Sequence, residues 1–411
     1  MPEYRTPIQP VLCTDGSPHP NPLPATPEEG TGGRAAGWAL LALLAFAAPA
    51  VAGPAIGFNL WDPTPHAEDP QRLVSEVEAM HAAGFRRVVL IPFVYADLTS
   101  GRVRQVWPGD KYTSMTDAEW AAAAKRAKQL GMTVGLTPFV EPRNRTVGRN
   151  EIDFTPATLA GRVFWDDYRE AVVGFARLAK EAGVDEFNVG SELVGMDYDR
   201  ANASEWKQLI DTAADAFGRD VGYTTQHWTF DQKATVEMIW QHPRITAVSL
   251  SAYLDHQPEH GHPGLASPDD CRGTNSDGQT FIDTVARNFD AFYTKRVKPV
   301  ADATNKPVRI GEFGIPPYDT ATLIPYRWHW PKETPYDPAE AANVWRGILI
   351  AAAKHPELKS IDAWIWGWPG GFPAERFYLR PNATDDPGTG GFDESQSNSV
   401  IAVLQAAAKR N

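Results

Sequence analysis

Cysteine is scarce in this chain, with only Cys13 and Cys271 among 411 residues. Two cysteines cannot build a disulfide framework, and we expect Cys13 to be lost with a leader segment, which would leave Cys271 alone. Clustered basic residues are also lacking in the body of the chain, whose net charge is −12. Because nucleic acids are bound through clustered cations, we expect no nucleic-acid partner.

The N-terminal segment does not have the pattern of a folded domain. Residues 1–33 are rich in proline, glycine and polar side chains, so they bury too little apolar surface to offset the entropy lost on ordering, and we expect them to be disordered. The apolar run 35–52 then ends in Ala-Val-Ala. Residues 34–52 therefore predict a signal peptide cleaved after Ala52 and a secreted or periplasmic protein. The alternative is an uncleaved N-terminal anchor through 35–52, which would hold the protein at a membrane.

The remaining residues, 53–411, alternate short apolar runs with segments of helical period. The runs predict eight strands, at 56–61, 87–93, 133–139, 186–192, 221–225, 245–252, 307–312 and 360–366. The predicted helices that follow them lie at 69–83, 117–130, 164–182, 205–217, 231–240, 280–303, 338–354 and 397–409. Near-continuous apolar strands are typical of a parallel sheet covered on both faces. A Rossmann-type sheet would need a Gly-rich turn after the first strand, which is absent. We therefore expect an α/β fold, a single (β/α)8 TIM barrel.

Two glutamates stand at the ends of predicted strands. Glu192 ends the fourth strand and Glu312 ends the seventh. TIM barrels carry their functional residues at the C-terminal ends of the strands. A carboxylate at a buried strand end is costly unless it is paired or functional, so we expect the two to share one site. The alternative is two unrelated glutamates, each in a salt bridge.

This order of strands, with a glutamate ending the fourth and another ending the seventh, resembles glycoside hydrolase clan A. Six segments resemble the family 113 β-mannanases and their relatives: 175–179 (FARLA), 188–193 (NVGSEL), 206–210 (WKQLI), 222–228 (GYTTQHW), 248–253 (VSLSAY) and 310–314 (IGEFG). The resemblance implies a retaining endo-glycoside hydrolase for β-1,4-mannan or glucomannan, with Glu192 as acid/base and Glu312 as nucleophile. Many clan members place Asn directly before the acid/base. Here Ser191 stands in that position, which leaves the sugar preference open.

Other residues near the predicted strand ends are candidates for holding the sugar. Tyr253 could hydrogen-bond Glu312 and keep it in line. Trp366 and Trp368 alternate at the end of the eighth strand and should share a face, and we favour Trp366 as the platform under the sugar. The further candidates for the cleft are His227, Trp228, Ser191, Asn59 and Trp61, with Glu141 and Arg143, for which an ion pair is the slightly preferred interpretation. Trp328 and Trp330 could form a distant subsite or pack their own loop.

A histidine-rich loop follows the sixth predicted strand. His256, His260 and His262 lie there with Asp255 and Glu259. Their spacing could bind a metal, but no helix frames them, so we expect neither a metal nor a cofactor. Metallohydrolase barrels typically carry His-x-His at the first strand, where this chain has Asn-Leu-Trp.

Three functions are compatible with these residues. The first is a retaining endo-β-mannanase. The second is a clan A glycosidase for another β-glucan or a bacterial exopolysaccharide, and the third is a barrel that binds glycan without hydrolysing it. In each case the expected partner is a polysaccharide or oligosaccharide, and we expect a monomer.

Overall fold

The computed structural model describes residues 53–61, 71–110, 114–144, 147–197, 199–231, 237–258, 263–327, 330, 334–366, 379 and 400–410. All of them lie in one compact unit, 50–411. The predicted leader, 1–33, and the predicted signal, 34–52, lie outside the described residues. Within the described part of the chain, every helix is too short or too polar to cross a membrane.

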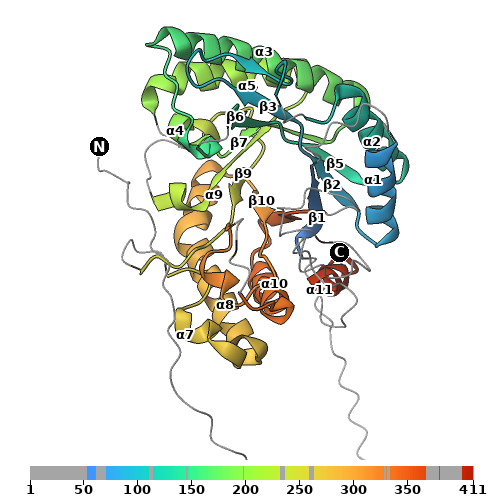
Figure 1. Cartoon of the computed structure of the whole chain (residues 1–411), viewed down its shortest axis with the longest axis vertical. Helices are drawn as coiled ribbons and strands as arrows, with labels where there is room; N and C mark the ends of the chain where they lie inside the picture. The colour runs from blue at the N-terminus through green and yellow to red at the C-terminus, as the bar shows by residue number, and fades with distance from the viewer. Residues whose placement is uncertain are drawn as a thin grey trace, which may run out of the picture. The chain divides into compact units, whose positions relative to one another are not determined.

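Eight parallel strands close into a barrel (Figure 1). They are β1 (Ala55–Leu60), β2 (Arg87–Leu90), β5 (Thr133–Leu136), β7 (Glu186–Ser191), β8 (Gly222–Gln226), β9 (Val248–Ser251), β10 (Val308–Phe313) and β11 (Leu358–Ala363). Each strand pairs with the next barrel strand along the chain, and β1 pairs with β11 to complete the ring. The predicted (β/α)8 TIM barrel is therefore confirmed.

Helices lie on the outside of the barrel, between successive strands (Figure 1). The longer ones are α1 (Arg72–Ala82), α2 (Asp117–Gln129), α3 (Leu159–Ala182), α5 (Ala203–Phe217), α8 (Gln279–Phe292), α9 (Lys298–Thr304), α10 (Pro338–Ala352) and α11 (Val400–Ala408). The short ones are α4 (Val194–Asp197), α6 (Glu237–Trp240), α7 (Pro268–Cys271), η1 (Arg149–Glu151), η2 (Arg200–Asn202), η3 (His227–Asp231), η5 (Gly273–Asp277), η6 (Tyr293–Val297) and η7 (Ala321–Leu323). The start of α2 follows from its sequence, because the Thr116 side chain and Glu119 form a reciprocal capping box.

A small second sheet, which the sequence did not predict, continues the path of two barrel strands. Its strands are β3 (Phe93–Ala96), β4 (Val103–Arg104) and β6 (Phe139–Pro142), with β3 parallel to β6 and antiparallel to β4. The predicted strands 87–93 and 133–139 are thus each divided in two. Pro92 and Pro138 stand at the two breaks. Proline has no N–H to donate to a ladder, so each barrel strand ends before it.

Charged side chains fill part of the barrel interior. Arg87 donates to both carboxylate oxygens of Asp362, at 2.7 and 2.9 Å, and its Nη1 lies 2.8 Å from Glu186. Arg309 also pairs with Glu186, at 2.9 Å. A Cβ on Gly57 would lie 2.3 Å from an Asp362 oxygen, so only glycine leaves room for this pair. The inward faces of the strands are therefore partly polar, and most apolar strand residues pack outward against the helices.

Candidate active site

Glu192 and Glu312 both follow irregularities in the barrel ladder. The pairing of β7 with β8 shifts between Asn188 and Ser191, and the pairing of β10 with β9 shifts between Ile310 and Glu312. Irregularities of this kind re-aim the side chain at the end of a strand. Glu192 is 8% exposed and Glu312 is 7% exposed, so both residues are almost completely enclosed.

The backbone at Glu192 has an uncommon conformation. Its φ is 57°, in the left-handed region that favours glycine. Its amide donates to the carbonyl of Thr224 on β8 at 2.8 Å, and the preceding Ser191 is buried and paired in register with Thr224. Such a conformation persists only where the surroundings hold it, and it occurs disproportionately at functional sites.

A largely buried arginine lies beside Glu192. In η1, Arg149 places Nη2 2.8 Å from Glu141 and Nη1 3.8 Å from Glu192. Burial works to lower the pKa of Arg149, but the charges of Glu141, Glu192 and Glu312 raise it overall. The guanidinium therefore contacts Glu141 and Glu192 and also feels the charge of Glu312. Sequence reasoning missed Arg149 because it follows no predicted strand.

Tyr253 contacts Glu312 directly. Its hydroxyl donates to Oε1 of Glu312 at 2.8 Å, which is the hydrogen bond that the sequence suggested. Tyr253 is 7% exposed, and its ring lies 6.2 Å from that of Phe313 on β10. The bond holds one oxygen of Glu312 in place.

An aromatic cluster lies against these charged groups. The Trp364 ring stacks on those of Phe139 and Trp61, with centroids 6.0 Å apart in each pair. The Arg149 guanidinium lies 3.9 Å from the Phe139 ring centroid. Tyr253 belongs to the same cluster. The aromatic cluster beside the glutamates is therefore built around Trp364, which is itself only 2% exposed.

The prediction that Trp366 is the sugar platform was wrong. Strand β11 ends at Ala363, three residues before its predicted end. Trp366 is fully buried, its ring packs 5.2 Å from that of Phe58, and its Nε1 donates to Glu76 on α1 at 3.0 Å. It therefore belongs to the layer between β1 and α1. The neighbouring candidate Trp368 lies outside the described residues.

The two candidates on β1 have different surroundings. Asn59 is 2% exposed, and its Nδ2 donates to the carbonyls of Gly311, at 3.1 Å, and Asp362, at 3.5 Å. It therefore ties strands together inside the barrel rather than lining a cleft. Trp61, which is also buried, lies in the aromatic cluster, with its ring 5.1 Å from that of Phe93.

The predicted ion pair between Glu141 and Arg143 was also wrong. Arg143 instead binds both oxygens of Asp110, at 2.7 and 2.8 Å, and its guanidinium lies 4.4 Å from the Trp107 ring centroid. Glu141 pairs with Arg149. Glu141 and Arg143 therefore each pair with a residue further away in the sequence than the other.

His227 and Trp228 lie just after β8, at the same end of the barrel as the glutamates. Nε2 of His227 is 3.4 Å from Asp255, and Trp228 donates its Nε1 to Gln226. Burial works to raise the pKa of Asp255, but the hydrogen bond and charge of His227 lower it overall. Burial, followed by the Asp255 charge, raises the pKa of Tyr326 to about 12. These residues form a polar group beside Tyr253.

The histidine-rich loop is only partly described. A ring nitrogen of His256 lies 2.9 Å from the Pro263 carbonyl. His260, His262 and Glu259 lie outside the described residues, as does Trp328. The ring of Trp330 stacks 5.5 Å from that of Tyr318, as expected for loop packing.

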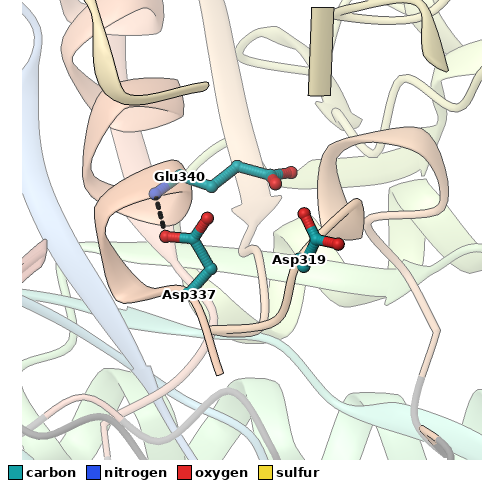
Figure 2. A group of neighbouring side chains, drawn as sticks. All are labelled: Asp319, Asp337 and Glu340. Atoms are coloured by element: carbon teal, nitrogen blue, oxygen red, sulfur yellow. Dashed lines mark hydrogen bonds between the residues drawn. The ribbon is translucent and has the colours of Figure 1, made fainter. Parts of the chain in front are cut away.

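Among the described residues, one acidic group has oxygens close enough to hold a cation. Asp319, Asp337 and Glu340 lie where the loop after β10 meets α10, with ligand atoms within 4.8 Å of one another (Figure 2). Asp337 caps α10 by accepting from the Glu340 amide at 2.9 Å. The Glu340 carboxylate accepts from the amides of Thr320 and Thr322, both at 2.9 Å, and burial raises its pKa to about 7. These hydrogen bonds give the acidic group a structural role, because they tie the loop after β10 to the start of α10.

The barrel and its pair of enclosed glutamates at strand ends are those of a (β/α)8 glycoside hydrolase. The sequence profile of Glycoside Hydrolase Family 113 matches residues 66–376. The chain therefore belongs to this family. No curated protein sequence is significantly similar to the chain.

Solved structures of related enzymes have the same fold. The complex of a family 113 β-1,4-mannanase is 17% identical, with a TM-score of 0.62 over 87% of this chain and 98% of that one. The family 113 β-mannanase of Alicyclobacillus acidocaldarius is 20% identical, with a TM-score of 0.59 over 89% and 100%. A family 5 mannosidase of Rhizomucor miehei is 13% identical, with a TM-score of 0.53 over 87% and 93%. At these identities the likeness shows the fold alone.

Proposed function

We propose that this glycoside hydrolase is a retaining endo-β-mannanase that cleaves β-1,4-mannan or glucomannan. The observation that supports the proposal most directly is the grouping of Glu192 and Glu312 around Arg149, with Tyr253 bonded to Glu312. The family match and the β-mannanases of the same fold favour mannan over other β-linked polymers.

The chemistry would follow a double displacement. Glu192 protonates the leaving glycosidic oxygen while Glu312 attacks the anomeric carbon and forms a glycosyl-enzyme. Glu192 then takes a proton from water, which hydrolyses that intermediate and restores both carboxyl groups. This mechanism requires the two carboxyl groups to stand about 5–5.5 Å apart.

Two further residues would support the reaction. The Arg149 guanidinium offsets part of the negative charge of the carboxyl groups around it, which would otherwise repel one another. Trp364 would provide the flat face on which the sugar at the cleavage point stacks. The remaining candidates, His227, Trp228 and Trp61, would act at the edge of the site.

The glutamate roles are tested by Glu192→Ala and Glu312→Ala, measured on mannan and glucomannan. Removing the general acid should lower kcat/KM by roughly 10²- to 10⁴-fold, and removing the nucleophile should lower it at least as much. Glu78→Ala is a matched control, because Glu78 is an exposed glutamate paired with Arg126 on the outer helices. Full turnover by Glu312→Ala would overturn the proposal.

Stereochemistry and substrate are tested separately. Proton NMR of the first-formed product should detect the β-anomer, and an α-anomer would rule out retention. A screen over mannan, glucomannan, xylan, β-glucans and bacterial exopolysaccharides should find turnover on the mannans. Turnover on another polymer alone would favour the second candidate function, which Ser191 motivates. Binding without turnover would identify a glycan-binding barrel.

The place of action remains part of the proposal. From the predicted signal peptide 34–52 we infer a secreted or periplasmic protein. We expect it to be a monomer whose partner is a polysaccharide or oligosaccharide. An uncleaved segment would instead anchor the same enzyme to a membrane.

A further inference from the structure

A carboxyl group that the proposed reaction does not use lies behind Glu192. Asp197, at the end of α4, is fully buried. Its Oδ2 accepts hydrogen bonds from the hydroxyls of Tyr223 and Thr225, each at 2.9 Å. Both donors are on β8, where they alternate with Thr224, whose hydroxyl bonds Ser249 in the barrel interior. Asp197 therefore lies on the outer side of β8, away from the sugar.

The Tyr223 hydroxyl connects this carboxyl to the backbone at Glu192. While it donates to Asp197, it accepts from the amide of Leu193 at 3.0 Å. The amide of Glu192 itself donates to the Thr224 carbonyl at 2.8 Å. The peptide groups on both sides of Glu192 are thus held by β8, one through a main-chain carbonyl and the other through a side-chain hydroxyl.

The conformation of Glu192 explains why both peptide groups need holding. At a φ of 57°, a residue with a Cβ is in a sparsely populated and strained region of backbone conformation. If either bond were lost, rotation about φ or ψ would relax the backbone and swing the carboxyl away from the cleavage point. The Tyr223 hydroxyl can accept a hydrogen bond from the Leu193 amide only while its own proton points away from that amide. The hydrogen bond that Tyr223 donates to Asp197 keeps the proton in this direction.

We propose that Tyr223 and Asp197 are positioning residues that fix the carboxyl of Glu192. Asp197 orients the Tyr223 hydroxyl, the hydroxyl holds the Leu193 amide, and the amide keeps Glu192 in its left-handed conformation. Neither residue touches the substrate. This inference rests on the proposed function, because it assigns Glu192 the role of acid/base.

Four variants test the hydrogen bonds among Asp197, Tyr223 and Leu193 one at a time. Tyr223→Phe removes the acceptor for Leu193, and Asp197→Ala removes the acceptor for Tyr223. Asp197→Asn is the conservative variant, since its amide oxygen still accepts from both hydroxyls. Thr225→Val is the matched control: it removes the other donor to the same carboxyl but leaves the contact between Tyr223 and Leu193 intact.

The kinetic readout compares two leaving groups. On mannohexaose, whose leaving group needs protonation, Tyr223→Phe and Asp197→Ala should lower kcat/KM roughly 10- to 100-fold, as expected for a misplaced acid. On 2,4-dinitrophenyl β-mannobioside, which leaves without acid help, the loss should be less than about threefold. Asp197→Asn and Thr225→Val should stay within about threefold of wild type on both substrates. Equal losses on both substrates would mark a merely structural role and overturn the inference.

A second measurement does not depend on the substrate. Crystal structures of wild type and Tyr223→Phe should show that the Glu192 carboxyl is displaced in the variant and that residue 192 has left the left-handed region. In Thr225→Val, the carboxyl position and the backbone conformation of Glu192 should both be unchanged. An unmoved carboxyl in Tyr223→Phe would refute the inference even if no mannoside were cleaved. Activity that survives Glu192→Ala would instead refute the proposed function and leave this structural result standing.

Discussion

At the scale of single residues, two tryptophans two positions apart have opposite surroundings. Trp364 stacks on Phe139 in the aromatic cluster, next to Tyr253 and Arg149. Trp366 packs between β1 and α1, bonded to Glu76. This difference is the reason why we propose sugar stacking for Trp364 and a structural packing role for Trp366.

Matched phenylalanine variants test this division. Trp364→Phe should lower kcat/KM on mannan roughly fivefold, because a smaller ring loses about 1 kcal/mol of stacking. Trp366→Phe should leave kcat/KM unchanged and lower the free energy of unfolding by roughly 1–3 kcal/mol, since a buried hydrogen bond to Glu76 is lost. Steady-state kinetics and urea unfolding of both variants provide the comparison. Equal losses of kcat/KM in the two variants would contradict this division of roles.

The error at Trp366 has a simple physical origin. Alternation along a strand assigns faces correctly only if the end of the strand is known, and β11 ends at Ala363. The sequence did indicate that Glu192, Glu312 and Tyr253 lie at or just after strand ends, because the apolar runs that form those strands are recognisable. It did not locate Arg149, because a loop arginine is brought to the site only by the tertiary fold.

At the scale of elements, the layer of charges inside the barrel connects strands that are far apart in sequence. Arg87 on β2 joins Asp362 on β11 and Glu186 on β7, and the Arg87 and Asp362 side chains are 7% and 3% exposed. The number of strands could be predicted from their apolar runs. The polar interior could not be predicted, because hydrophobic periodicity indicates which residues are buried but not that buried charged residues face the inside of the barrel. The breaks at Pro92 and Pro138 did have a visible signal in the sequence.

Removing one partner of this buried pair should be costly. Arg87→Met leaves Asp362 and Glu186 without their cation, so we expect the free energy of unfolding to fall by roughly 3–5 kcal/mol. Arg126→Met is the control, because its bridge to Glu78 is exposed and worth less than about 1 kcal/mol. Urea denaturation followed by circular dichroism measures both. A similar small loss in the two variants would mean that the interior pair contributes little.

At the scale of the whole molecule, buried acids couple stability to pH. Burial raises the pKa of Asp197 to about 8 and that of Glu340 to about 7. In the unfolded chain both groups ionise near pH 4. Between these values the unfolded state has lost protons that the folded state still holds, so stability that is present at low pH is lost as the pH rises.

The melting temperature should therefore be higher near pH 5 than near pH 8. The slope is set by the number of retained protons, at roughly 1.4 kcal/mol per proton and pH unit. Asp197→Asn and Glu340→Gln should each flatten the profile, while the exposed Asp269→Asn should not. Differential scanning calorimetry across this range decides the matter. A melting temperature that rises towards pH 8 would contradict the raised pKa values of Asp197 and Glu340.

The pairing of β1 with β11 makes the first and last barrel strands neighbours. During synthesis, β1 emerges about 300 residues before its partner, so the nascent chain carries an open strand edge until β11 has been made. Shortened chains that lack β11 would keep that edge and be prone to aggregate. A circular permutant that joins the two ends and opens an outer loop elsewhere would remove the delay without moving either glutamate.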